Sequence, residues 1–177
     1  LKEMEMAAHR FRQKLDVKKA MITTDCCYNE DIKIRSDVFI HHDHNLIAIR
    51  KSTDSEEEIK LCFHYRLCVE EDVSTAPELM DYWYTINGKD IDIRYEIFAG
   101  LFDYKGIIRL FSDGNSKVSA KENCFSFETV LNKHHPSTFY ILFCDNVDAE
   151  DYLRLSDRIK ADALEQGFDG VFKSHVA

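Results

Sequence analysis

Apolar and polar residues alternate most regularly in residues 79–98. An Asn87-Gly88 pair stands between two apolar runs, residues 79–86 and 90–98. Because both turn residues tolerate positive φ, such a pair indicates a tight hairpin. Beyond the turn, one face carries alternate apolar residues and the other carries the charged residues Asp90, Asp92, Arg94 and Glu96. The segment therefore predicts two antiparallel strands, with one apolar and one charged face.

Other apolar runs predict further strands. Residues 31–38 and 46–49 read as a second hairpin, whose tip carries the run His41-His42-Asp43-His44-Asn45. Buried strands are predicted at three further places, residues 59–69, 107–111 and 138–144. Residues 125–131 fit either a helix or a strand, and residues 112–123 are predicted to form a loop.

Two segments show the spacing of amphipathic helices. In residues 1–21, apolar residues including Phe11 and Leu15 recur three and four positions apart, and residues 149–166 show the same spacing. Gly167 is a natural residue to end the second helix, with residues 168–172 as a short strand or packing segment. We therefore predict an α+β fold, a mixed or antiparallel sheet flanked by an N-terminal and a C-terminal helix.

Composition limits the class of protein. The 177 residues, 45% hydrophobic, suit one domain spanning residues 1–177, and a start at Leu1 leads us to expect a piece of a larger protein. The net charge of −9 argues against nucleic-acid binding through a broad basic surface. No run of 18 apolar residues predicts a membrane span, so no membrane partner is expected.

The cysteine pattern bears on the compartment. Six cysteines occur without Cys-x-x-Cys spacing, mostly in apolar strand-like runs. Such cysteines are typical of small buried residues in a reducing environment. We therefore expect an intracellular protein, cytoplasmic or nuclear.

Acidic residues around the first hairpin give the strongest functional pattern. Glu78 follows Pro77, Asp90 or Asp92 lies across the Asn-Gly turn, and Lys105 comes later. Metal-dependent phosphodiester cleavage requires carboxylates from adjacent strands and a nearby cation. This order resembles the PD-(D/E)xK nuclease superfamily. It is most similar to the cap-snatching endonuclease domains of segmented negative-strand RNA virus polymerases, such as the influenza acidic-subunit N-terminal domain.

The resemblance implies a set of roles and partners. Mn or Mg would be held by His9, Glu78, Asp90 and Asp92, and Lys105 would be catalytic. The substrate would be RNA, and the protein partners would be other polymerase subunits or host proteins. Where the family has Asp after Pro, this chain has Glu78. We therefore predict a metal-dependent RNA endonuclease-like domain of a viral-type polymerase, intact or degenerate.

Two alternatives stay open. The charged strand face could simply be solvated, which favours a catalytically inactive intracellular protein-interaction domain. The histidine run at the second hairpin tip could also bind metal, because His42 and His44, two residues apart on a strand, share a face. Imidazole ligands suit Zn, Mn or Fe, although histidines at a hairpin tip are more often solvated.

Overall fold

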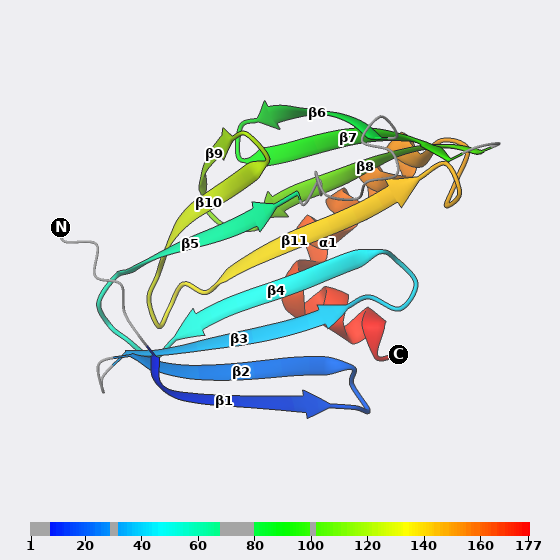
Figure 1. Ribbon diagram of the computed structural model, residues 1–177. Helices are drawn as coiled ribbons and strands as arrows, with labels where there is room; N and C mark the ends of the chain where they lie inside the picture. The colour runs from blue at the N-terminus through cyan, green and yellow to red at the C-terminus, as the bar shows by residue number, and fades with distance from the viewer. Residues whose placement is uncertain (1–7, 29–31, 68–79, 100–101) are drawn as a thin grey trace.

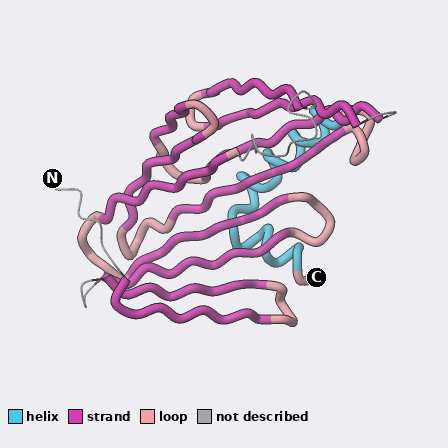
Figure 2. The backbone as a smooth tube through the Cα atoms, in the orientation of Figure 1, coloured by secondary structure: helices cyan, strands magenta, loops and turns pink. Residues whose placement is uncertain are grey.

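A computed structural model describes residues 8–28, 32–67, 80–99 and 102–177, which form eleven β-strands and one α-helix (Figures 1 and 2). The elements, in chain order, are β1 (Ala8–Asp16), β2 (Met21–Tyr28), β3 (Ile32–Ile40), β4 (Leu46–Thr53), β5 (Ile59–Arg66), β6 (Met80–Asn87), β7 (Asp90–Ala99), β8 (Phe102–Ser112), β9 (Lys117–Lys121), β10 (Cys124–Leu131), β11 (Ser137–Asp145) and α1 (Tyr152–His175).

The strands form two antiparallel sheets. The large sheet has the order β1-β2-β3-β4-β11-β8-β7-β6, and the small sheet has the order β5-β10-β9. The small sheet and α1 lie on opposite faces of the large sheet (Figure 1). The described part of the chain is therefore a β-sandwich with a helix as a third layer.

The central strand β11 explains why three layers are needed. Nearly all of its residues are buried, because β11 lies between β4 and β8 and is covered on both faces. Phe139 and Ile141 belong to the apolar cluster under the small sheet. Tyr140 and Leu142 belong to the cluster under α1. A strand that is apolar on both faces requires cover on both sides.

Aromatic side chains fill the space between the two sheets. The Phe139 ring stacks on Phe63 of β5 with ring centroids 4.9 Å apart, and it meets Phe127 of β10 edge-on at 6.0 Å. Phe127 and Phe139 are each only 1% exposed. These contacts attach the small sheet to the centre of the large one.

The predicted N-terminal helix is wrong, and with it the α+β fold class. Residues 8–16 form strand β1, which pairs along its length with β2. Phe11 and Leu15 are four residues apart, and that spacing places two side chains on one face of a helix and equally on one face of a strand. Pairing with β2, which lies across a short turn, decides between the two.

Smaller predictions also need correction. Strand β9 lies within the predicted loop of residues 112–123. Helix α1 continues to His175, so residues 168–172 are helical. Gly167 does leave the helical conformation, at φ 64°, but the chain resumes its helix beyond this kink.

The hairpin predicted around the Asn-Gly pair is confirmed. Strands β6 and β7 pair from Met80↔Ile97 to Asn87↔Asp90. The two loop residues are thus Gly88 and Lys89, and Gly88 has φ 64°, which suits glycine at the first position of a tight hairpin loop. The hairpin predicted around the histidine run is also confirmed, as β3 and β4.

We expect Phe139→Ala to lower the free energy of unfolding by about 3–5 kcal/mol, because it removes the ring on which both sheets pack. Val147→Ala, at an exposed position just after the same strand, is the matched control and should change it by less than about 0.5 kcal/mol. Urea denaturation checks both. Equal, small effects of the two changes would contradict the two-sheet core.

Candidate functional site: the charged face of β7 and a histidine cluster

On the charged face of β7, Asp90 and Asp92 lie toward α1, whereas Arg94 is exposed to solvent. Asp90 Oδ2 accepts a hydrogen bond from Lys160 Nζ of α1 at 2.6 Å. Both side chains are mostly buried, and Asp90 Oδ1 has no hydrogen-bond partner among the described residues. Asp90 is therefore half of an ion pair that joins the sheet to the helix.

Arg109 forms the second connection between the sheet and α1. Its side chain, on β8, donates to Ser156 Oγ at 2.9 Å and lies 2.6 Å from the Asp157 carboxylate. The other side of the guanidinium lies 3.6 Å from Asp92. Arg109 is only 7% exposed, so Asp92 and Asp157 offset a charge that is almost completely buried.

Lys105 lies away from these acids. It is opposite Glu96 in the β7–β8 register and its Nζ is 3.2 Å from the Glu96 carboxylate. Asp92 is opposite Arg109, four residues further along β8. At a rise of about 3.3 Å per residue, the backbone of Lys105 is roughly 13 Å along the strand from that of Arg109.

The remaining two predicted ligands are His9 and Glu78. His9 is in β1, at the opposite edge of the large sheet from β6 and β7. Six strand spacings of about 4.8 Å place its backbone roughly 29 Å from β7. Glu78 lies outside the described residues. The structure therefore does not bring His9, Asp90, Asp92 and Lys105 together, and an Mn or Mg site built with Glu78 remains a prediction.

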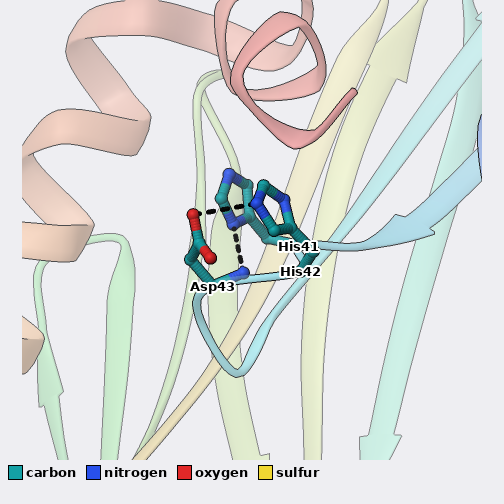
Figure 3. Close-up of side chains that lie close together, drawn as sticks. All are labelled: His41, His42 and Asp43. Atoms are coloured by element: carbon teal, nitrogen blue, oxygen red, sulfur yellow. Dashed lines mark hydrogen bonds and ion pairs between the residues drawn. The ribbon is translucent and has the colours of Figure 1, made fainter. Parts of the chain in front are cut away.

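A different cluster forms at the β3–β4 turn (Figure 3). One nitrogen or oxygen atom from each of His41, His42 and Asp43 lies within 4.8 Å of the others. His42 Nε2 is 2.9 Å from Asp43 Oδ2. The His44 ring stacks on the His41 ring, with centroids 4.8 Å apart. Among the described residues, this is where potential metal ligands gather most closely.

Helix α1 fixes the orientation of His41, which is buried. The Asp43 backbone N–H donates to His41 Nδ1 at 3.2 Å. His41 Nε2 lies 3.1 Å from Ser174 Oγ, which itself donates to the Val171 carbonyl. The Ser174 oxygen must therefore accept the remaining proton, so His41 is neutral with its proton on Nε2.

His175, at the end of α1, also contacts the β3–β4 turn. Its Nδ1 accepts the His42 backbone N–H at 3.2 Å, and its Nε2 is 3.2 Å from the Lys19 carbonyl oxygen. Since a carbonyl can only accept, Nε2 carries the proton. His175 thus joins the β3–β4 turn to the β1–β2 turn.

Burial lowers the pKa of His41, and the neighbouring imidazoles of His44, His42 and His175 lower it further. A neutral imidazole is the form that binds a metal. A cleft of about 180 Å³ opens beside His41 between the turn and α1, and it is also lined by Asp43, His44 and Asp162. The cluster is therefore reachable and rich in nitrogen and oxygen donors.

The structure shows an exposed apolar surface that the sequence analysis did not predict. Phe11, Leu15, Ile22 and Ile40, on β1, β2 and β3, are exposed large apolar residues. We call these four residues the β1–β3 face. The sequence signal is the spacing of Phe11 and Leu15, four residues apart, which fits one face of a strand as well as the helix that we predicted.

Comparison with known proteins shows a fold and no family. No family model and no curated protein matches the sequence. A solved structure described as "Putative kojibiose phosphorylase from human microbiome" is similar to this chain, with a TM-score of 0.68 and 13% sequence identity. The match covers 97% of this chain and 24% of that one, so this chain spans about a quarter of the matched protein.

We expect Arg109→Met to lower the free energy of unfolding by about 2–4 kcal/mol. It leaves Asp92 without its cation while keeping most of the apolar side-chain volume. Arg158→Met, on an exposed position of the same helix, is the control and should change stability by less than about 0.5 kcal/mol. Thermal and urea unfolding check the pair. A stable Arg109→Met protein would contradict the assignment of these charges to helix docking.

Proposed function

We propose that this chain is a non-catalytic β module of a larger carbohydrate-active protein of the glycoside phosphorylase kind. The observation that carries the proposal is the fold match, which takes in 97% of this chain but only 24% of the matched protein. A unit that makes up about a quarter of a longer chain is one part of it among several. The catalytically inactive interaction domain is thus the favoured one of the two functions expected from the sequence.

The described carboxylates of β7 support a structural role. Cleavage of a glycosidic bond, by water or by phosphate, generally needs a carboxyl group that faces the substrate and protonates the leaving oxygen. Asp90 is instead paired with Lys160, and Asp92 is next to Arg109, both beneath α1. A substrate would have to displace α1 to reach them. We therefore place the catalytic chemistry of the larger protein outside this module.

The β1–β3 face is the surface through which the module would dock. Cross-strand neighbours run from Leu15 to Ile22, Val38, Ile49 and then Phe139. Phe139 and Ile49 belong to the core under the small sheet. The same row of apolar side chains therefore continues from the core into solvent, beyond the edge of the small sheet.

Two residues of the β1–β3 face are unusually exposed for large apolar side chains. Phe11 is 65% exposed and Leu15 is 60% exposed. Neighbouring exposed apolar residues of this kind typically mark an interface. We assign its occupant to the rest of the same larger polypeptide, because about three quarters of the matched protein lies outside the matched part.

The proposal keeps an intracellular location, cytoplasmic or nuclear. The six cysteines lack Cys-x-x-Cys spacing and stand mostly in apolar strand-like runs, which suits a reducing compartment. No helix of the described residues has the length and apolar character needed to cross a membrane.

Hydroxyl-radical footprinting of the isolated chain and of the natural polypeptide tests the docking. We expect the natural polypeptide, isolated with an antibody against this chain, to be much longer than 177 residues. Oxidation of Phe11 and Leu15 should be several-fold slower in it than in the isolated chain, because docking excludes water from the β1–β3 face. Trp83, exposed on the opposite edge strand β6, is the internal control and should be oxidised at similar rates.

Equal oxidation of Phe11 and Leu15 in the two samples would contradict the docking proposal.

A separate assay tests the nuclease activity that the sequence predicted. The isolated chain, incubated with Mn²⁺ and RNA, should leave the RNA intact, because Asp90 is paired with Lys160 and Lys105 is paired with Glu96 further along the sheet. RNA cleavage that is lost in both Asp90→Asn and Lys105→Ala would overturn the non-catalytic assignment.

A further inference from the structure

We propose that the β3–β4 turn binds one divalent transition-metal ion of the zinc class through His41 Nδ1, His42 Nε2 and the Asp43 carboxylate. The inference does not depend on the proposed function. It rests on three adjacent residues whose donor atoms lie within 4.8 Å of one another at a tight turn (Figure 3). Two imidazoles and a carboxylate are a frequent protein ligand set for zinc.

The orientation of His41 is the strongest argument. In metal sites, a ligating histidine almost always donates its other ring N–H to a protein acceptor, which fixes its tautomer and its ring. His41 does this already, because its Nε2 proton goes to Ser174 Oγ at 3.1 Å. The Nδ1 lone pair consequently faces the turn, where His42 and Asp43 lie.

Small movements are enough to close the site. Zinc bonds of about 2.0–2.2 Å in a tetrahedron require ligand atoms roughly 3.3–3.6 Å apart. His42 and Asp43 are 48% and 65% exposed, so their side chains can turn toward buried His41 without disturbing the core. The Asp43 N–H would leave His41 Nδ1 for water, at a cost of about 1 kcal/mol.

The nitrogen and oxygen donor atoms of this cluster determine which metal ions it should prefer. Imidazole nitrogen favours zinc and neighbouring transition metals, whereas Mg²⁺ and Ca²⁺ favour sites made of oxygen donors. Asp162 of α1 lines the same cleft as His41 and Asp43 and adds a second negative charge near the ion. The fourth position is left to a water molecule.

Binding would also tighten the junction between the turn and the helix. Ser174 and His175, in the last turn of α1, contact His41 and the His42 backbone. An ion held by His41 and His42 would therefore hold the end of α1 against the large sheet. Zn²⁺ should therefore raise the melting temperature of the chain as well as bind to it.

Calorimetric titration of the tag-free chain with Zn²⁺ tests the proposal. We expect one ion per chain, a raised melting temperature, and a Co²⁺ absorption spectrum typical of a four-coordinate site. His42→Ala and Asp43→Ala should each weaken Zn²⁺ binding at least tenfold, and Ser174→Ala should weaken it about 10–100-fold through His41. Circular dichroism without metal verifies that each variant is folded.

His134→Ala is the matched control, because His134 is an exposed histidine at another hairpin turn. It should bind Zn²⁺ as the unchanged chain does. Binding that survives His42→Ala and Asp43→Ala unchanged would overturn the site. The same conclusion follows if the chain binds no Zn²⁺, or if His134→Ala weakens binding as much as His42→Ala.

Discussion

The double burial of β11 is the constraint on which the rest of the structure depends. This strand is apolar on both faces and lies in the middle of the large sheet. One face is covered by aromatic residues of the small sheet, and the other by the apolar face of α1. Because each cover is narrower than the large sheet, the outer strands β1 to β3 extend beyond the small sheet. The exposed β1–β3 face follows from this geometry.

The same layering decides what the acids of β7 can do. Alternation along β7 places Ile91 and Ile93 under the small sheet and Asp90 and Asp92 under α1. Charges that a helix covers require partners, and Lys160 and Arg109 provide them. Such buried pairs add little net stability compared with apolar packing, but removing one partner is costly. The Asp90 and Asp92 carboxylates thus each lie next to a cation beneath α1.

The sequence was most informative where local rules decide the structure. The Asn87-Gly88 turn and the alternation after it correctly predicted β6 and β7, and the run of residues 138–144 correctly predicted β11. The N-terminal segment failed, because Phe11 and Leu15 fit a helix and a strand equally well. Pairing with β2 resolves that ambiguity. The spacing of residues within one segment does not reveal such pairing, because it depends on a second segment.

The candidate site was harder to predict for a related reason. The spacing of Asp90, Asp92 and Lys105 along the chain resembled a nuclease, but it says nothing about which face α1 will cover. The histidine run was visible in the sequence and was expected at a hairpin tip. Its connection to Ser174 and His175 was not visible, because more than 130 residues separate them. Contacts between a turn and a distant helix become apparent only in the fold.

A double-mutant cycle on Asp90 and Lys160 tests the central claim most directly. The free energies of unfolding of the unchanged chain, Asp90→Asn, Lys160→Met and the double variant give the coupling between the two side chains. A structural ion pair beneath α1 predicts a favourable coupling of about 1–3 kcal/mol, with the double variant more stable than the sum of the single effects implies. A coupling near zero would mean that Asp90 does not hold the helix, and it would contradict the structural role assigned to the charged face of β7.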